Sequence, residues 1–321
     1  MSLVRNCLLI ALFCSHTPAR AQAQAATPDP SFGPNPHLVG WANLVFPGLG
    51  ATLRGDAGRG LVQLSYEGAT FGAGYALSDT KGFSSLDGIS DSFKPFNKSK
   101  GARNAQEGIE SKMAANIFLE FSIKAHLVNT FTEYRDAFKA RGITEGLDQH
   151  SPIEGMILPF STTYIKEPDV WIPLALVAAA VTLDYATSSP GAITPLNGSS
   201  NALYSFNYGV WQPLGSGYPE EVAYRGFLQH ELKSATGSPL LAVVLQALAF
   251  AFSHEPGGGR YSAALVGTYL GYLSEKHHGD LGPGTTLHFW GDTLLGVESL
   301  LLSNRAQHTT PQAGFSLQFN Y

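Results

Sequence analysis

Cysteine is almost absent from this chain. Its 321 residues include two cysteines, Cys7 and Cys14, and both lie within the first 25 residues. We predict that this first segment is a secretion signal, so the mature chain has no thiol, no disulfide and no cysteine ligand. A thiol-dependent protease is therefore excluded.

Charged side chains are also scarce. They make up 14% of the residues, whereas 44% are hydrophobic, and soluble domains carry about 25% charged residues. This deficit indicates that part of the chain lies in lipid. The net charge is -5, and no basic stripe with interleaved aromatics occurs. We therefore expect a lipid bilayer as a partner and no nucleic acid.

Three common catalytic signatures are missing. No G-x-S-x-G elbow of the kind found in serine hydrolases is present. The H-E-x-x-H zinc motif is absent too, because Pro256 and Gly257 follow His254-Glu255. The glycine run 257–259 lacks the lysine and Ser/Thr of a phosphate-binding loop. The sequence therefore gives no support for a serine hydrolase with this elbow, a zinc enzyme with this motif, or a protein with a phosphate-binding loop of this type.

The N-terminus has the parts of a secretion signal. Arg5 supplies a positive charge, Cys7 to Cys14 is a short apolar run, and alternating alanines from Ala19 to Ala25 offer cleavage sites. An uncleaved anchor helix is the alternative, although the apolar run is short for a span. We predict a signal over 1–25, a linker over 26–40, and a location in the bacterial inner membrane.

Residues 41–168 precede the clearest membrane span. The apolar, glycine-rich stretches 41–53 and 60–77 predict a membrane hairpin, with a pair of strands as the alternative. Residues 78–112 are polar and predict an exposed loop. Apolar residues at helical spacing predict an amphipathic helix over 113–131, followed by another polar stretch.

The C-terminal part predicts an all-α polytopic membrane bundle over 169–303. Residues 170–186 form the clearest hydrophobic span, with aromatics near both ends. Four further helices are expected over 219–233, 239–253, 261–274 and 285–302. The tail 304–321 ends in an alternating segment, 315–321, that predicts a short strand or a disordered tail. This segment also resembles the last strand of an outer-membrane barrel, but 170–302 contains no comparable series.

Three short polar groups interrupt these apolar helices. They are Glu220-Glu221 with Arg225, Phe250 to His254, and His288 to Asp292. Ionisable groups cost several kcal/mol in an apolar interior unless they are paired or hydrated, so together they indicate a site. Taken singly, each also fits a structural role: solvated glutamates at a helix start, a capping histidine, or an aspartate that orients a histidine.

The order and spacing of these groups resemble the CPBP family of intramembrane proteases, which includes the CAAX-processing endopeptidases. The resemblance covers roughly residues 170–302. It implies that Glu220 takes a proton from water, that His254 holds this water, and that His288 and Asp292 stabilise the oxyanion. Supporting roles fall to Glu221, Arg225 and Phe250.

Asp292 departs from the CAAX-processing members, which have asparagine at this position. An ionised aspartate cannot donate a hydrogen bond. Asp292 is therefore protonated, or orients His288, or binds a metal. A zinc ion suits the set Glu220, His254, His288 and Asp292, and its requirement is left open.

The sequence therefore predicts an intramembrane endopeptidase that acts on a membrane peptide or protein substrate. Two alternatives stay open: a non-enzymatic scaffold or immunity-type protein on the same fold, and an outer-membrane protein. The remaining histidines are given no catalytic role. His230-Glu231 is interpreted as capping or facing water, and His277-His278 as solvated.

Overall fold

The computed structural model describes residues 33–77, 104–187, 206–254 and 258–309. Every regular element in these ranges is a helix, and none is a strand. The all-α prediction is therefore confirmed. The predicted signal and the predicted strand over 315–321 lie outside the described residues.

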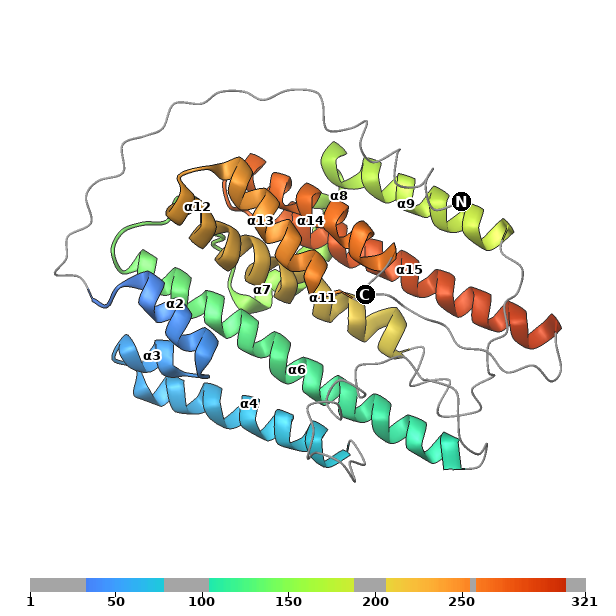
Figure 1. The fold of residues 1–321 in the computed structure, drawn as a ribbon, viewed down its shortest axis with the longest axis horizontal. Coiled ribbons are helices and arrows are strands. Elements are labelled where there is room, and N and C mark those ends of the chain that lie inside the picture. The colour runs from blue at the N-terminus through green and yellow to red at the C-terminus, as the bar shows by residue number, and fades with distance from the viewer. Residues whose placement is uncertain (1–32, 78–103, 188–205, 255–257, 310–321) are drawn as a thin grey trace.

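A compact helical hairpin opens the described chain (Figure 1). It comprises α2 (Pro36–Val45), α3 (Leu49–Leu53) and α4 (Ala57–Leu77). The helix α2 begins inside the predicted linker, because the Asn35 side chain caps it and Pro36 suits its first turn. Gly48 makes the turn before α3 with φ of 80°. The predicted hairpin is thus helical, and the alternative of two strands is wrong.

The long helix α6 (Asn104–Lys139) runs through the middle of the molecule, between the hairpin and the remaining helices (Figure 1). It is longer than predicted and continues through the polar residues after 131. Those side chains have partners: Glu133 is buried and accepts hydrogen bonds from Arg54 and Gln63. The sequence between Gly108 and Gly142 also contains no proline or glycine to end the helix.

The next segment leads to the predicted span. Its elements are α7 (Pro152–Ile157), the 3-10 turn η2 (Leu158–Phe160), α8 (Thr162–Ile165) and α9 (Pro168–Thr187). Within the described residues, α9 is the one helix with the length and hydropathy of a membrane span: its mean hydropathy is 1.6, and 6% of its apolar window is buried. Its bounds agree closely with the predicted 170–186.

Residues 207–236 form one continuous rod rather than a helix that begins at Pro219. The rod comprises the π-helical η3 (Asn207–Trp211), α11 (Gln212–Glu221), the π-helical η4 (Val222–Gln229) and α12 (His230–Thr236). Pro219 lies inside α11, so the prediction of a helix start there is wrong. Proline removes one helical hydrogen bond, and the wider π-helical turns nearby accommodate its loss.

The interpretation of His230 and Glu231 as capping or water-facing residues is also wrong. The Tyr134 hydroxyl lies 2.7 Å from His230 Nδ1 and donates to Glu231. Glu231 also accepts from Trp41 Nε1 at 2.7 Å. These contacts join α12 to α2 and α6, so the pair fastens the C-terminal rod to the N-terminal hairpin.

The last three helices are α13 (Pro239–Phe252), α14 (Gly258–Lys276) and α15 (Gly282–Thr309). They match the predicted helices, with α15 extending further at its end. In Figure 1, α15 lies beside α9 and against α11, while α13 packs on α14. The largest core cluster joins α6 to the rod and to the start of α15; its buried members include Phe131, Tyr134, Tyr218, Val222, Phe227 and Leu281.

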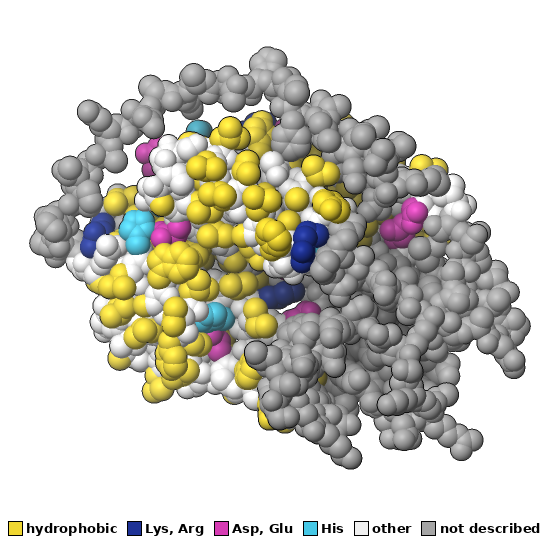
Figure 2. Space-filling model, viewed as in Figure 1, with side chains coloured by type: hydrophobic (Ala, Val, Ile, Leu, Met, Phe, Trp, Pro, Cys, Tyr) yellow, Lys and Arg dark blue, Asp and Glu magenta, His cyan; other side chains and the backbone are white. Residues whose placement is uncertain are grey.

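Apolar side chains reach the surface over many helices. Figure 2 shows them spread across one face, where charged side chains are few and scattered. Val45 is 80% exposed and Leu240 is 75% exposed. Exposed apolar surface of this extent is typical of a protein that contacts lipid or another apolar partner.

Candidate active site

The predicted site residues come from three helical segments. Glu220 and Glu221 end α11, His288 and Asp292 lie one turn apart on α15, and His254 follows α13. Small residues let α11 and α15 approach each other closely. A Cβ on Gly284 would lie 3.0 Å from Glu221 Oε2, and one on Gly217 would lie 3.2 Å from the Phe289 side chain.

His288 occupies the centre of the group. Its Nδ1–H donates to Glu221 Oε1 over 2.8 Å. Its Nε2 lies 3.9 Å from Glu220 Oε2 and 3.6 Å from Asp292 Oδ2. The imidazole is nearly buried, whereas the two carboxylates beside Nε2 keep some exposure. The structure therefore brings Glu220, His288 and Asp292 together around one ring nitrogen.

Glu221 is the residue that orients His288. This buried carboxylate shares Oε1 between His288 and Arg225, whose Nη1 donates over 2.9 Å. The Arg225 guanidinium also donates to Gly267 O and lies 4.4 Å above the Phe250 ring. Glu221 and Arg225 thus form a buried ion pair next to His288, and the Phe250 ring packs against the Arg225 guanidinium.

Asp292 has a partner that the sequence did not suggest. The Ser216 hydroxyl donates to Asp292 Oδ2. Ser216 lies four residues before Glu220 and thus on the same face of α11. That spacing is a signal that could have placed it in the site. The hypothesis that Asp292 orients His288 is less well supported than orientation by Glu221. Glu221 Oε1 lies 2.8 Å from His288 Nδ1, whereas Asp292 Oδ2 lies 3.6 Å from His288 Nε2.

His254 lies beside this group rather than inside it. Its Nδ1–H donates to the Phe250 carbonyl over 2.7 Å. The His254 ring centroid lies 4.5 Å from that of Phe250, which in turn lies 5.8 Å from that of His288. His254 is still close enough to Glu220 for their charges to interact. The Phe250 ring therefore lies next to both imidazoles.

Lys124 reaches the same region from α6. Its charge interacts with that of Glu220, and its Nζ lies 3.6 Å from Glu120 Oε2. The lysine side chain packs against Gly215, where a Cβ would lie 2.6 Å from Nζ. Sequence reasoning placed Lys124 on an amphipathic helix without linking it to the site, because nothing in a single sequence pairs α6 with α11.

The donor types of Glu220, His254, His288 and Asp292 suit a zinc ion, but their placement does not, because they are not among the described groups whose ligand atoms all lie within 4.8 Å of one another. In each of the two histidines, an oxygen acceptor holds Nδ1–H: Glu221 for His288 and Phe250 O for His254. This leaves each Nε2 with a lone pair, which is the arrangement that zinc-binding histidines adopt. With the carboxylates of Glu220 and Asp292, the group offers two nitrogen and two oxygen donors.

Residues 202–294 match the family model described as type II CAAX prenyl endopeptidase Rce1-like. The match covers less than a third of the chain. It contains all of the predicted site residues and lies inside the bundle predicted over 169–303. The Rce1-like family is a membrane-embedded protease family, so the match confirms the resemblance of this segment to the CPBP proteases. No curated protein and no solved structure matches the chain.

Proposed function

We propose that this protein is an intramembrane endopeptidase whose Rce1-like segment hydrolyses a peptide bond of a membrane-associated substrate. The observation that carries the proposal is that Glu220 Oε2 and Asp292 Oδ2 lie 3.9 Å and 3.6 Å from His288 Nε2. At the other ring nitrogen, Nδ1, His288 donates a hydrogen bond to the buried carboxylate of Glu221. Convergence of polar groups in apolar surroundings favours an enzyme over a scaffold on the same fold.

Each residue has a role that its position supports. Glu220 takes the proton from the attacking water, and His254, whose charge interacts with that of Glu220, is assigned to hold that water. In its imidazolium form, which Glu221 stabilises through the hydrogen bond at Nδ1, His288 donates from Nε2 to the oxyanion. Asp292 accepts a hydrogen bond from the Ser216 hydroxyl. Its carboxylate lies beside His288 Nε2, the ring nitrogen that faces the substrate in this proposal.

A zinc ion held by Glu220, His254, His288 and Asp292 is not part of this proposal, because the structure does not bring these four donors together. The residue roles above do not depend on it. The location we propose is the bacterial inner membrane, and the substrate class is a membrane peptide or protein without a prenyl requirement.

The test compares wild-type protein with Glu220→Gln and His254→Ala in liposomes that carry a library of membrane peptides. We expect the initial cleavage rate to fall by about 10²-fold or more in both variants, because general base catalysis contributes 10²–10⁴-fold. Glu145→Gln is the matched control, since Glu145 is exposed in the segment before α7 and should keep the wild-type rate.

Full activity of both variants would exclude these roles. Absence of cleavage by well-folded wild-type protein across the library would favour the scaffold instead. Comparison of membrane peptides from cells that carry wild type or Glu220→Gln then identifies the natural substrate by its accumulation.

A further inference from the structure

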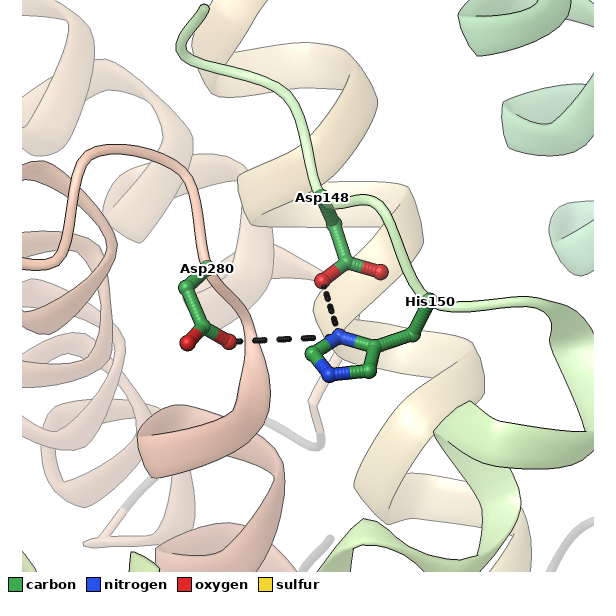
Figure 3. A group of neighbouring side chains, drawn as sticks. All are labelled: Asp148, His150 and Asp280. Atoms are coloured by element: carbon green, nitrogen blue, oxygen red, sulfur yellow. Dashed lines mark hydrogen bonds and ion pairs between the residues drawn. The ribbon is translucent and has the colours of Figure 1, made fainter. Parts of the chain in front are cut away.

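A second polar group lies outside the candidate active site. Asp148 and His150 belong to the segment between α6 and α7, and Asp280 belongs to the turn between α14 and α15 (Figure 3). One ligand atom from each residue lies within 4.8 Å of the others. Three potential metal donors from two segments far apart in the sequence therefore meet at one point.

The donor atoms face one another. His150 Nδ1 lies 2.7 Å from Asp148 Oδ1 and 3.9 Å from Asp280 Oδ1. Figure 3 shows the imidazole with this nitrogen turned toward both carboxylates. Donors on a shared tetrahedral zinc ion lie roughly 3.4 Å apart, because each bond is about 2.0–2.2 Å long. The observed separations lie on either side of that value, so small side-chain movements suffice to chelate an ion.

Each donor is also held in place by a further contact. The Tyr164 hydroxyl lies 3.4 Å from His150 Nε2 and donates to Asp280. Asp148 accepts from Leu281 N, and its other oxygen lies 3.4 Å from the Tyr218 hydroxyl. Asp280 also accepts from Gly282 N over 2.7 Å. Metal ligands usually have outer partners of this kind, which fix the tautomer and the direction of the lone pairs.

Charge and burial favour a cation here. The Asp148 side chain is fully buried, while those of His150 and Asp280 are 27% and 37% exposed. Two carboxylates beside a neutral imidazole carry two negative charges, which a divalent ion neutralises. The exposed edge gives an ion access.

We propose that Asp148, His150 and Asp280 form a zinc site that joins the segment before α7 to the start of α15. Zinc is the ion of choice because imidazole suits zinc better than magnesium or calcium, and carboxylates complete the set. Three protein ligands leave one coordination position for water. This site is separate from the candidate active site and does not depend on the proposed peptidase activity.

A second group of similar composition provides a contrast. Glu167, Asp169 and His277 also lie close together, but the Lys276 ammonium already pairs with Asp169. A bound zinc ion would be repelled by this lysine. We therefore expect no zinc there, and variants of Asp169 serve as the control.

The location of the proposed site gives it a structural role. Asp280 precedes the first turn of α15, the helix that carries His288 and Asp292. Asp148 lies 3.4 Å from the hydroxyl of Tyr218, two residues before Glu220. Zinc at this point fixes the ends of the two helices that supply the candidate active site.

The test measures zinc binding to the full chain, purified in detergent without a histidine tag and stripped with a chelator. Calorimetric titration and metal analysis count the zinc ions bound by wild type, His150→Asn, Asp280→Asn, Asp169→Asn and Glu220→Gln. Asparagine keeps a donor toward Asp148 in the first variant and an acceptor for Gly282 N in the second. Both variants should therefore fold, as circular dichroism will check.

We expect His150→Asn and Asp280→Asn each to bind one zinc equivalent fewer than wild type, or to bind that equivalent at least about tenfold more weakly. Asp169→Asn and Glu220→Gln should retain it. Equal stoichiometry and affinity in wild type and both His150→Asn and Asp280→Asn would overturn the proposal. Loss of the zinc ion in Asp169→Asn, with retention in His150→Asn and Asp280→Asn, would also overturn the proposal.

Discussion

At the scale of single residues, the buried carboxylate of Glu221 accepts hydrogen bonds from two other side chains. Its Oε1 accepts from Arg225 and from His288, and all three side chains are buried. A buried arginine that loses its partner keeps an uncompensated charge in an apolar interior. Glu221 therefore connects the stability of the rod to the orientation of the candidate catalytic histidine.

A double-mutant cycle tests this connection. We expect Glu221→Gln to lower the free energy of unfolding by about 3–5 kcal/mol, because it leaves the Arg225 charge unpaired. The double variant Glu221→Gln/Arg225→Met should recover most of that loss, since both charges are gone. Unfolding in detergent measures each value. Simple additivity of the two single changes would show that the pair is not coupled.

Residue chemistry was the most predictable part of the site. The i,i+4 spacing of Glu221 with Arg225, and of His288 with Asp292, could be read from the sequence and agrees with the geometry. The contact between Glu221 and His288 could not, because it joins α11 to α15. Lys124 was missed for the same reason, because α6 and α11 are far apart in the sequence, whereas the four-residue spacing of Ser216 from Glu220 was a signal that could have been used.

At the scale of elements, the short helix α7 is fitted against the rod through a glycine. A Cβ on Gly155 would lie 2.1 to 2.3 Å from atoms of the Tyr218 ring. Tyr218 is buried two residues before Glu220. The absence of a side chain at Gly155 therefore sets how closely α7 approaches the candidate catalytic turn.

Gly155→Ala should accordingly displace Tyr218 and lower the free energy of unfolding by about 1–3 kcal/mol. Gly72→Ala in α4 is the matched control, since no atom lies within 4 Å of the added Cβ. It should raise stability by about 0.5–1 kcal/mol through helix propensity. Thermal unfolding in detergent compares the two. Equal stability of these variants would contradict the close packing of α7 on the rod.

Element types were predicted better than element ends. The helices over 239–253 and 170–186 nearly coincide with α13 and α9, because a proline and the change of polarity mark their limits. Pro219 misled, since proline at a first turn and proline inside a helix give the same local signal. The polar end of α6 was likewise missed, because its helix depends on Arg54 and Gln63 of the hairpin.

At the scale of the whole molecule, α9 lies on the outside of the bundle beside α15 (Figure 1). Few of its residues are buried, and its length matches the thickness of a bilayer core. An apolar helix with so little protein around it is suited to a lipid environment. The position of α9 thus agrees with the membrane-embedded character of the Rce1-like family.

A charge in the middle of α9 should therefore impair membrane integration. Ala179 is exposed near the helix centre, and arginine there costs about 2.5–3.5 kcal/mol on insertion scales. Alkaline extraction of membranes should release a larger fraction of Ala179→Arg than of wild type. Thr187→Arg, at the helix end, is the control, because an arginine there reaches the interface. Equal retention of both variants would argue against α9 facing lipid.

The central position of α6 has a consequence for how the chain can be divided. Phe131 and Tyr134 of α6 pack with Tyr218, Val222 and Phe227 of the rod in one core cluster. The Rce1-like match begins at residue 202, after α6 has ended. Excised at the limits of that match, the protein would expose half of this core. The family segment therefore shares its core with α6, so we expect the segment alone to be less stable than the full chain.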